Sequence, residues 1–152
     1  MEELKKELEK LSKAYGDTPE NEEKILIPFV KRLLELPMKE RRKLLPVIRD
    51  LQWIKSKFAG FSSEITCSAA RAHFLSAVQF VCANKREMDM AYHVKFDMLC
   101  KLLPLYCPTW LMDFINDDKT WFNFNLNYEQ LMQLMDMGYL KEIAPSRIAH
   151  VL

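Results

Sequence analysis

Four prolines fall nine residues apart in the first third of the chain: Pro19, Pro28, Pro37 and Pro46. The segment 19–34 aligns with the segment 37–52 at an offset of 18 residues, so that each contains one opening and one internal proline. Because 18 residues make about five turns of an α-helix, equivalent side chains keep the same face. Each segment therefore predicts a helix that starts at a proline and is bent by a second one.

The composition favours helices in the rest of the chain as well. Among 152 residues there are 9 Met and only 3 Gly, whereas sheets are rich in β-branched residues and glycine turns. Apolar residues make up 49% of the chain, and 22 Lys plus Arg nearly balance 21 Asp plus Glu. We therefore expect one all-α domain over residues 1–152, with about eight short helices in antiparallel pairs.

The first half of the chain contains further helix signals. An apolar residue at every third or fourth position predicts an amphipathic helix from the N-terminus to Gly16. The segment from about residue 62 to 84 is apolar nearly all round and rich in small residues. It is predicted to form the buried central helix of the domain. Another helix is expected from about residue 87 to 103.

The C-terminal part has recognisable start and stop signals. Pro108 predicts the start of a short helix. Asn127 with Gln130 predicts a capping box, and Gly138 predicts the end of the helix that follows. A last helix opened by Pro145 has room for barely two turns, so we expect this chain to be the N-terminal piece of a longer helical array.

The helix lengths, the two 18-residue units and the internal Pro28 and Pro46 resemble HEAT or armadillo-type helical repeats, over residues 19–152 at most. The chain also resembles the N-terminal helical regions of longer uncharacterised bacterial proteins. In such families the implied role is a curved solenoid scaffold that binds another macromolecule. A repeat of about 40 residues does not continue after Phe58, so an irregular helical bundle is the alternative fold.

The residue pattern offers little for catalysis. Three glycines, isolated from one another, cannot form a phosphate-binding loop. His73 lies among small apolar residues and is expected to be a core histidine. Asp89, His93 and Asp97 recur at every fourth position and could face a divalent ion together, although a closed metal site needs more ligands. We therefore expect no enzymatic activity, no cofactor and no metal.

The cysteines and the termini suggest a cellular location. The four cysteines contain no CxxC pair, so we expect reduced thiols without a disulfide. The N-terminus alternates charges where a secretory signal would need an apolar core, and no apolar run approaches the about 20 residues of a membrane span. We expect a cytoplasmic protein with no membrane partner.

A basic arc is predicted on one side of the helix that begins at Pro37. At about 100° per residue, apolar side chains from Leu44 to Phe58 occupy one side. The opposite side carries cations and one indole: Lys39, Arg42, Lys43, Arg49, Trp53 and Lys57. The indole could stack on a base, grip a protein or pack against the next helix. The carboxylate of Asp50 and the small net charge of the chain weaken the positive potential that would attract phosphates, so nucleic acid is not the expected partner.

A second candidate surface lies in the segment 116–127, where aromatic and apolar residues alternate with asparagines. This period of two predicts an extended connector whose aromatics enter the core and whose asparagines bind backbone groups. The alternative is a ligand loop that uses Trp121, Phe122 and Phe124. Carboxylates dominate the charges of segment 108–140, so the chain has a basic N-terminal half and an acidic C-terminal end.

The sequence thus predicts a non-catalytic helical-repeat scaffold that binds a protein partner. Its candidate partner-binding residues are Lys39, Arg42, Arg49, Trp53, Lys57, Trp121, Phe122 and Phe124. The alternative function is a weak nucleic-acid-binding module that uses the basic face from Lys39 to Lys57.

Overall fold

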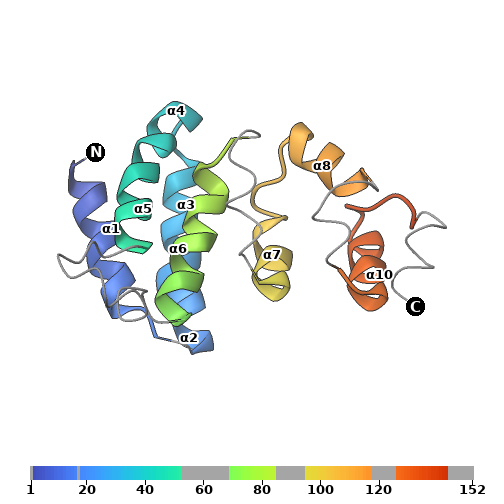
Figure 1. The fold of residues 1–152 in the computed structure, drawn as a ribbon, viewed down its shortest axis with the longest axis horizontal. Helices are drawn as coiled ribbons and strands as arrows, with labels where there is room; N and C mark the ends of the chain where they lie inside the picture. Colours follow the sequence, from blue (N-terminus) through green and yellow to red (C-terminus); the bar gives the residue numbers. More distant parts are fainter. Residues whose placement is uncertain (1, 17, 53–68, 85–94, 118–125, 144–152) are drawn as a thin grey trace, which may run out of the picture. The chain divides into compact units, whose positions relative to one another are not determined.

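The computed structural model describes residues 2–16, 18–52, 69–84, 95–117 and 126–143 (Figure 1). All regular elements in these ranges are helical, which confirms the predicted all-α class. Counted as continuous segments, the helices in these ranges number seven, and the eighth that was predicted after Pro145 lies outside them. None of the described helices is long and apolar enough to span a bilayer.

The chain divides into two compact units, residues 1–95 and 96–152. The prediction of one domain over residues 1–152 remains a prediction, because two compact units can still fold as one cooperative structure. The expectation that the chain belongs to a longer helical array likewise remains a prediction.

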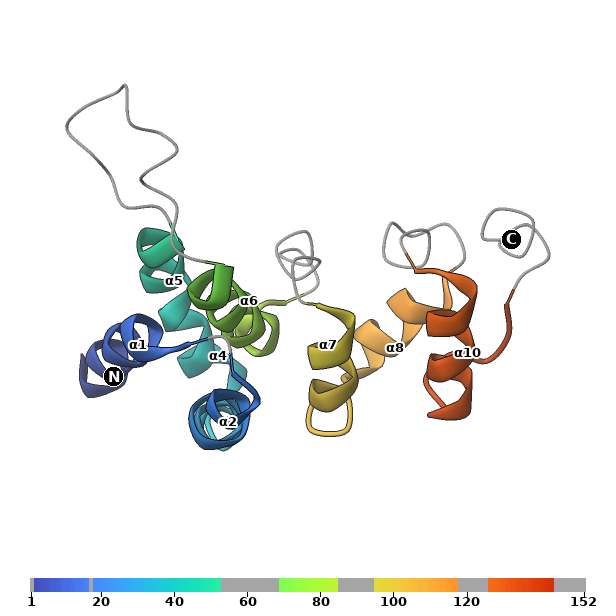
Figure 2. The same cartoon turned by 90° about the horizontal axis from the view of Figure 1, so that it is seen from below.

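The first unit contains three long helical stretches and one central helix. Its elements are α1 (Glu2–Ala14), α2 (Pro19–Asn21), η1 (Glu22–Leu26), α3 (Ile27–Leu34), α4 (Met38–Arg41), η2 (Arg42–Leu44), α5 (Leu45–Gln52) and α6 (Ala69–Cys82). The elements α2, η1 and α3 follow one another without a break, and so do α4, η2 and α5. Figure 2 shows α2 nearly end on, with α4 drawn between it and α5.

Pro28 and Pro46 both lie inside these continuous stretches, as predicted. One turn before each proline the backbone leaves α geometry. The segment η1 is π-helical and is closed by Ile27 N–H donating to Glu22 O, whereas η2 is a 3₁₀ turn closed by Leu45 N–H donating to Arg42 O. A proline has no N–H and its ring crowds the carbonyl four residues earlier, so a local change of helix type accommodates it.

The offset of 18 residues also relates positions of equal burial. The fully buried pairs are Leu26 with Leu44 and Val30 with Ile48, and the exposed pairs are Lys24 with Arg42, Pro28 with Pro46 and Lys31 with Arg49. Both internal prolines thus lie on the solvent side of their helices. A carbonyl that loses its helical donor there can bind water, which makes the proline less costly than it would be in the core.

The central helix of the first unit is α6, as predicted for the part of segment 62–84 that is described. The helices α1, α3, α4 and α5 all pack against it. Every residue from His73 to Ala83 is buried, including the polar Ser76 and Gln79. The Phe74 ring stacks on Tyr15 at a centroid distance of 5.0 Å and lies 6.2 Å from the ring of Phe29. This aromatic cluster joins α6 to α3 and to the end of α1.

The second unit contains α7 (Phe96–Leu102), α8 (Thr109–Asn116) and α10 (Tyr128–Asp136). Pro108 stands immediately before α8 in an extended conformation, as its position in the sequence predicted. The core of the described part includes buried side chains from all three helices and from the segments that follow α7 and α10: Met98, Leu99, Leu102, Leu103, Tyr106, Leu111, Ile115, Leu131, Leu134 and Leu140.

Both ends of α10 follow the sequence signals. The Asn127 side chain accepts from Gln130 N–H at 2.8 Å, and the Gln130 side chain accepts from Asn127 N–H at 3.0 Å, which confirms the capping box. At the other end Gly138 has a φ of +89°, Tyr139 N–H donates to Leu134 O and Gly138 N–H donates to Met135 O. These two bonds form a Schellman motif, which requires a left-handed residue.

We expect Gly138→Ala to destabilise the second unit by about 1 kcal/mol, because an L side chain disfavours positive φ. A Cβ at this position would meet no atom within 4 Å, so a clash cannot cause the loss. Thermal unfolding followed by circular dichroism measures the effect. Gly138→Asn is the control, since asparagine tolerates this conformation better and should lose less. Equal stability of the wild type and Gly138→Ala would contradict the prediction.

Candidate partner-binding surface

The helical stretch from Met38 to Gln52 has a buried inner side. Leu44, Leu45 and Ile48 are almost fully buried, and both α4 and α5 pack against α6. The spacing of these residues, one and three positions, gives a narrow apolar stripe on one side of the helix. The other side of the helix is therefore directed away from the core of the unit, as the sequence pattern predicted.

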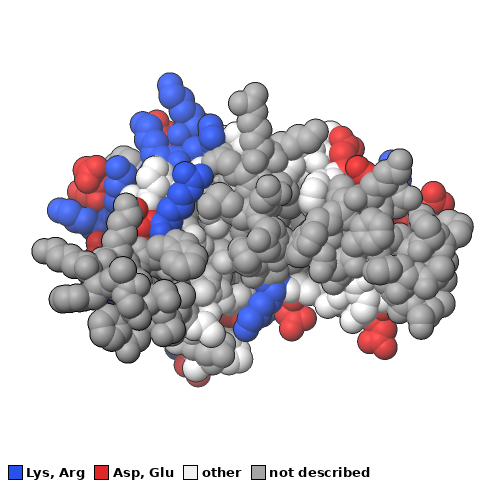
Figure 3. Space-filling model, viewed as in Figure 1, with Lys and Arg blue, Asp and Glu red and all other residues white. Residues whose placement is uncertain are grey.

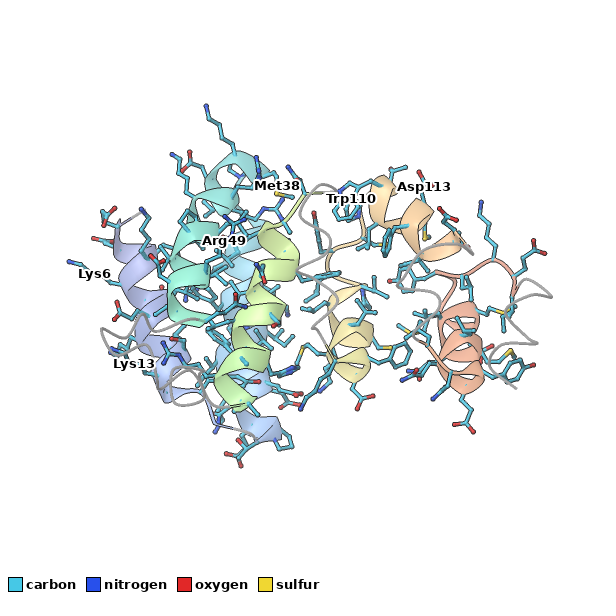
Figure 4. All side chains as sticks on the ribbon, in the orientation of Figure 1. Lys6, Lys13, Met38, Arg49, Trp110 and Asp113 are labelled. Carbon is cyan, nitrogen blue, oxygen red and sulfur yellow. The ribbon has the colours of Figure 1, made fainter. Side chains whose placement is uncertain are left out.

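The outer side carries three of the predicted partner-binding residues. Lys39, Arg42 and Arg49 are all exposed, and Pro46 is exposed between the two arginines. At about 100° per residue these positions fall within an arc of about 80°, so they form one line along the helix. We call Lys39, Arg42 and Arg49 the basic stripe. Figure 3 shows Lys and Arg gathered over α4 and α5, and Figure 4 labels Arg49 on α5.

Carboxylates interrupt the positive charge around this stripe. The ammonium of Lys43 lies 2.9 Å from Oε1 of Glu40, one turn earlier on the same helix. Asp50 directly follows Arg49 and is exposed. These two carboxylates lower the local potential and leave a surface of mixed charge, which is more typical of a protein interface than of a phosphate-binding face.

Arg41 belongs to the same run of cations, but its side chain has a structural role in the first unit. Its Nη1 donates to Val81 O at 2.8 Å, near the C-terminus of α6. A guanidinium at this end of a helix satisfies a carbonyl that has no helical donor and complements the helix dipole. This structural role of Arg41 was not predicted from the sequence. Its position three and four residues before Leu44 and Leu45 would have shown that it lies on the buried side.

The remaining predicted partner-binding residues lie outside the described part of the chain: Trp53, Lys57, Trp121, Phe122 and Phe124. The structure therefore brings together Lys39, Arg42 and Arg49 and leaves the proposed roles of the other five as predictions. Of the metal candidates, Asp89 and His93 also fall outside it, and Asp97 is exposed on α7. Among the described residues no group of three or more His, Cys, Asp and Glu side chains could hold a metal ion.

Asn116 is a structural residue whose long-range partners the sequence did not predict. Its Nδ2 donates to Met112 O and to Tyr139 O, each at 2.8 Å, and its Oδ1 accepts from Lys141 N–H at 2.8 Å. These bonds tie the end of α8 to the backbone that follows α10. Together with the cap at Asn127, they agree with the expectation that asparagines of the segment 116–127 bind backbone groups.

The remaining polar groups do not assemble a reactive centre within the described ranges. His73 is buried, as predicted, with its Nε2 4.0 Å from Oε1 of Glu22. Burial and the nearby carboxylate of Asp97 raise the pKa of the Cys100 thiol, and burial raises the pKa of Cys107. Both thiols therefore stay protonated near neutral pH, which makes them poor nucleophiles.

A family model described as a domain of unknown function (DUF6493) matches residues 2–152. No match was found among curated proteins or among solved structures.

Proposed function

Since the chain belongs to this family, whose description assigns no activity, we propose from its own surface that it is a non-catalytic helical-repeat scaffold that binds a protein partner. The basic stripe carries the proposal. It consists of three exposed cations in one line on a helix whose opposite side is anchored on α6. A rigid helix that presents a charged outer side is suited to recognition, because its side chains need little ordering when a partner binds.

The repeat character of the scaffold rests on the 18-residue offset. Several equivalent positions of the segments 19–34 and 37–52 have the same burial, from the core pair Leu26 and Leu44 to the exposed pair Lys31 and Arg49. Duplicated helices with matching inner and outer sides are typical of HEAT-like arrays. This similarity supports a solenoid over an irregular bundle.

The alternative is a weak nucleic-acid-binding module, which the alignment of Lys39, Arg42 and Arg49 on one side favours. The two functions differ in how they depend on salt. Binding dominated by phosphate contacts weakens steeply as salt is added, because bound counterions are released. The carboxylates of Glu40 and Asp50 beside the stripe argue for protein.

We expect labelled single- and double-stranded oligonucleotides to show no binding by fluorescence anisotropy at about 150 mM salt, where weak phosphate contacts are screened. Affinity capture from a lysate of the source organism should retain a protein on the wild type that Arg42→Glu/Arg49→Glu does not retain. Lys24→Glu/Lys31→Glu is the matched control, since it makes the same charge change at the equivalent exposed positions of the preceding helix.

Two results would contradict the proposed function. One is micromolar, salt-sensitive oligonucleotide binding that Arg42→Glu/Arg49→Glu abolishes, which would promote the nucleic-acid alternative. The other is capture of the same proteins by the wild type, the stripe variant and the control variant, which would show that the basic stripe binds nothing specific.

A further inference from the structure

We propose that the protein partner of the basic stripe is a second copy of this chain, which docks through the outer side of its α8. This inference rests on the proposed function and names the partner. The outer side of α8 carries Thr109, Asp113 and Asp117 at intervals of four residues, and all three are exposed. We call Asp113 and Asp117 the acidic pair. Figure 4 labels Asp113 on α8.

The acidic pair lies at an unfavourable place in its helix. Asp113 is in the C-terminal half of α8 and Asp117 is the residue at its C-cap, while the last turn holds no basic residue. Carboxylates near a helix C-terminus are repelled by the free carbonyls there. Glu129, by contrast, is in the first turn of α10, where a carboxylate is stabilising. Residues that lower the stability of their own helix, as these two carboxylates do, are typical of a surface retained for binding.

The two surfaces are complementary in charge. Over residues 38–52 the chain carries five cations and two carboxylates, whereas the described residues of the second unit carry two cations and six carboxylates. A chain of near-neutral total charge therefore presents a positive surface on one unit and a negative one on the other. This difference in charge favours contact between unlike units of two copies over contact between like units.

The spacings along the two helices are also compatible. Asp113 and Asp117 are about 6 Å apart along the axis of α8, and Arg42 and Arg49 are about 10 Å apart along theirs. Arginine side chains are long enough to close this difference, and each guanidinium can bind a carboxylate through two parallel hydrogen bonds. The contact joins two different surfaces and each copy carries both of them, so association raises the mass above that of one chain whether two copies pair reciprocally or further copies add in series.

Sedimentation velocity of the full chain across a concentration series tests the proposal. At about 50 mM salt the weight-average mass should rise above the 18.0 kDa of one chain as the concentration increases, and at about 500 mM salt it should return to that value. Arg42→Glu/Arg49→Glu and Asp113→Arg/Asp117→Arg should each weaken association at least tenfold. Lys24→Glu/Lys31→Glu should leave it unchanged.

Mixing the two weakened variants provides the sharpest result. The Arg42→Glu/Arg49→Glu variant keeps the acidic pair, and the Asp113→Arg/Asp117→Arg variant keeps the basic stripe. Association should therefore return in the mixture and depend on salt as in the wild type. If a charge reversal impairs folding, as circular dichroism would show, the neutral variants Arg42→Gln/Arg49→Gln and Asp113→Asn/Asp117→Asn replace it.

Three outcomes would overturn the proposal: a mass of one chain at every concentration in low salt, association that survives both double variants, or no association in the mixture. A chain that stays monomeric but still captures another protein through the basic stripe would reject the second copy and leave the proposed function standing. A chain that stays monomeric and also captures no protein through the basic stripe would reject both the second-copy proposal and the proposed function.

Discussion

Phe74→Ala is expected to destabilise the first unit by about 3–5 kcal/mol, since it removes a whole aromatic ring from a fully buried site. The variant loses the stacking on Tyr15 at 5.0 Å and the contact with Phe29, which together join three helices. For a unit of this size the midpoint of thermal unfolding should fall by more than about 10 °C. Thermal and urea unfolding measure the loss.

Phe74→Leu is the matched control for this cavity. It keeps most of the apolar volume and removes only the aromatic geometry, so we expect a loss of less than about 2 kcal/mol. If Phe74→Ala were as stable as the wild type, the aromatic cluster would not be an important part of the core.

Asn116→Asp is expected to destabilise the second unit by about 2–4 kcal/mol. The substitution keeps the shape of the side chain but replaces the Nδ2 donor with an oxygen, which would face the carbonyls of Met112 and Tyr139. Two hydrogen bonds are lost and two carbonyls are left beside a negative charge. The hydrogen bond from Lys141 N–H can persist, because the aspartate still accepts.

Hydrogen exchange read out by mass spectrometry separates these effects. In Asn116→Asp the second unit should exchange faster overall, while Asn116→Ala should in addition lose protection at the Lys141 amide. Asp117→Asn is the reverse exchange at the next, exposed residue and should change stability by less than about 0.5 kcal/mol. Equal effects of Asn116→Asp and Asp117→Asn would show that the bonds of Asn116 contribute nothing.

Features that depend on residues within one or two helical turns were predictable from the sequence. The capping box of Asn127 and Gln130 and the stop at Gly138 follow from groups at most five residues apart. The same holds for Pro28 and Pro46, because the solvent side of a helix is fixed by the positions of the apolar residues around it. The basic stripe was predictable for this reason, as the outer side of a helix whose inner side carries Leu44 and Ile48.

The partners of each side chain across the fold were decided only by the tertiary structure. Asn116 meets Tyr139 and Lys141, which are 23 and 25 residues away, and Phe74 meets Phe29 from α3 and Tyr15 just after α1. Arg41 and Arg42 are adjacent in the sequence, yet the first donates to α6 and the second is exposed. Periodicity determines which side of a helix is buried, whereas the helix against which that side packs depends on the free energy of the whole assembled core.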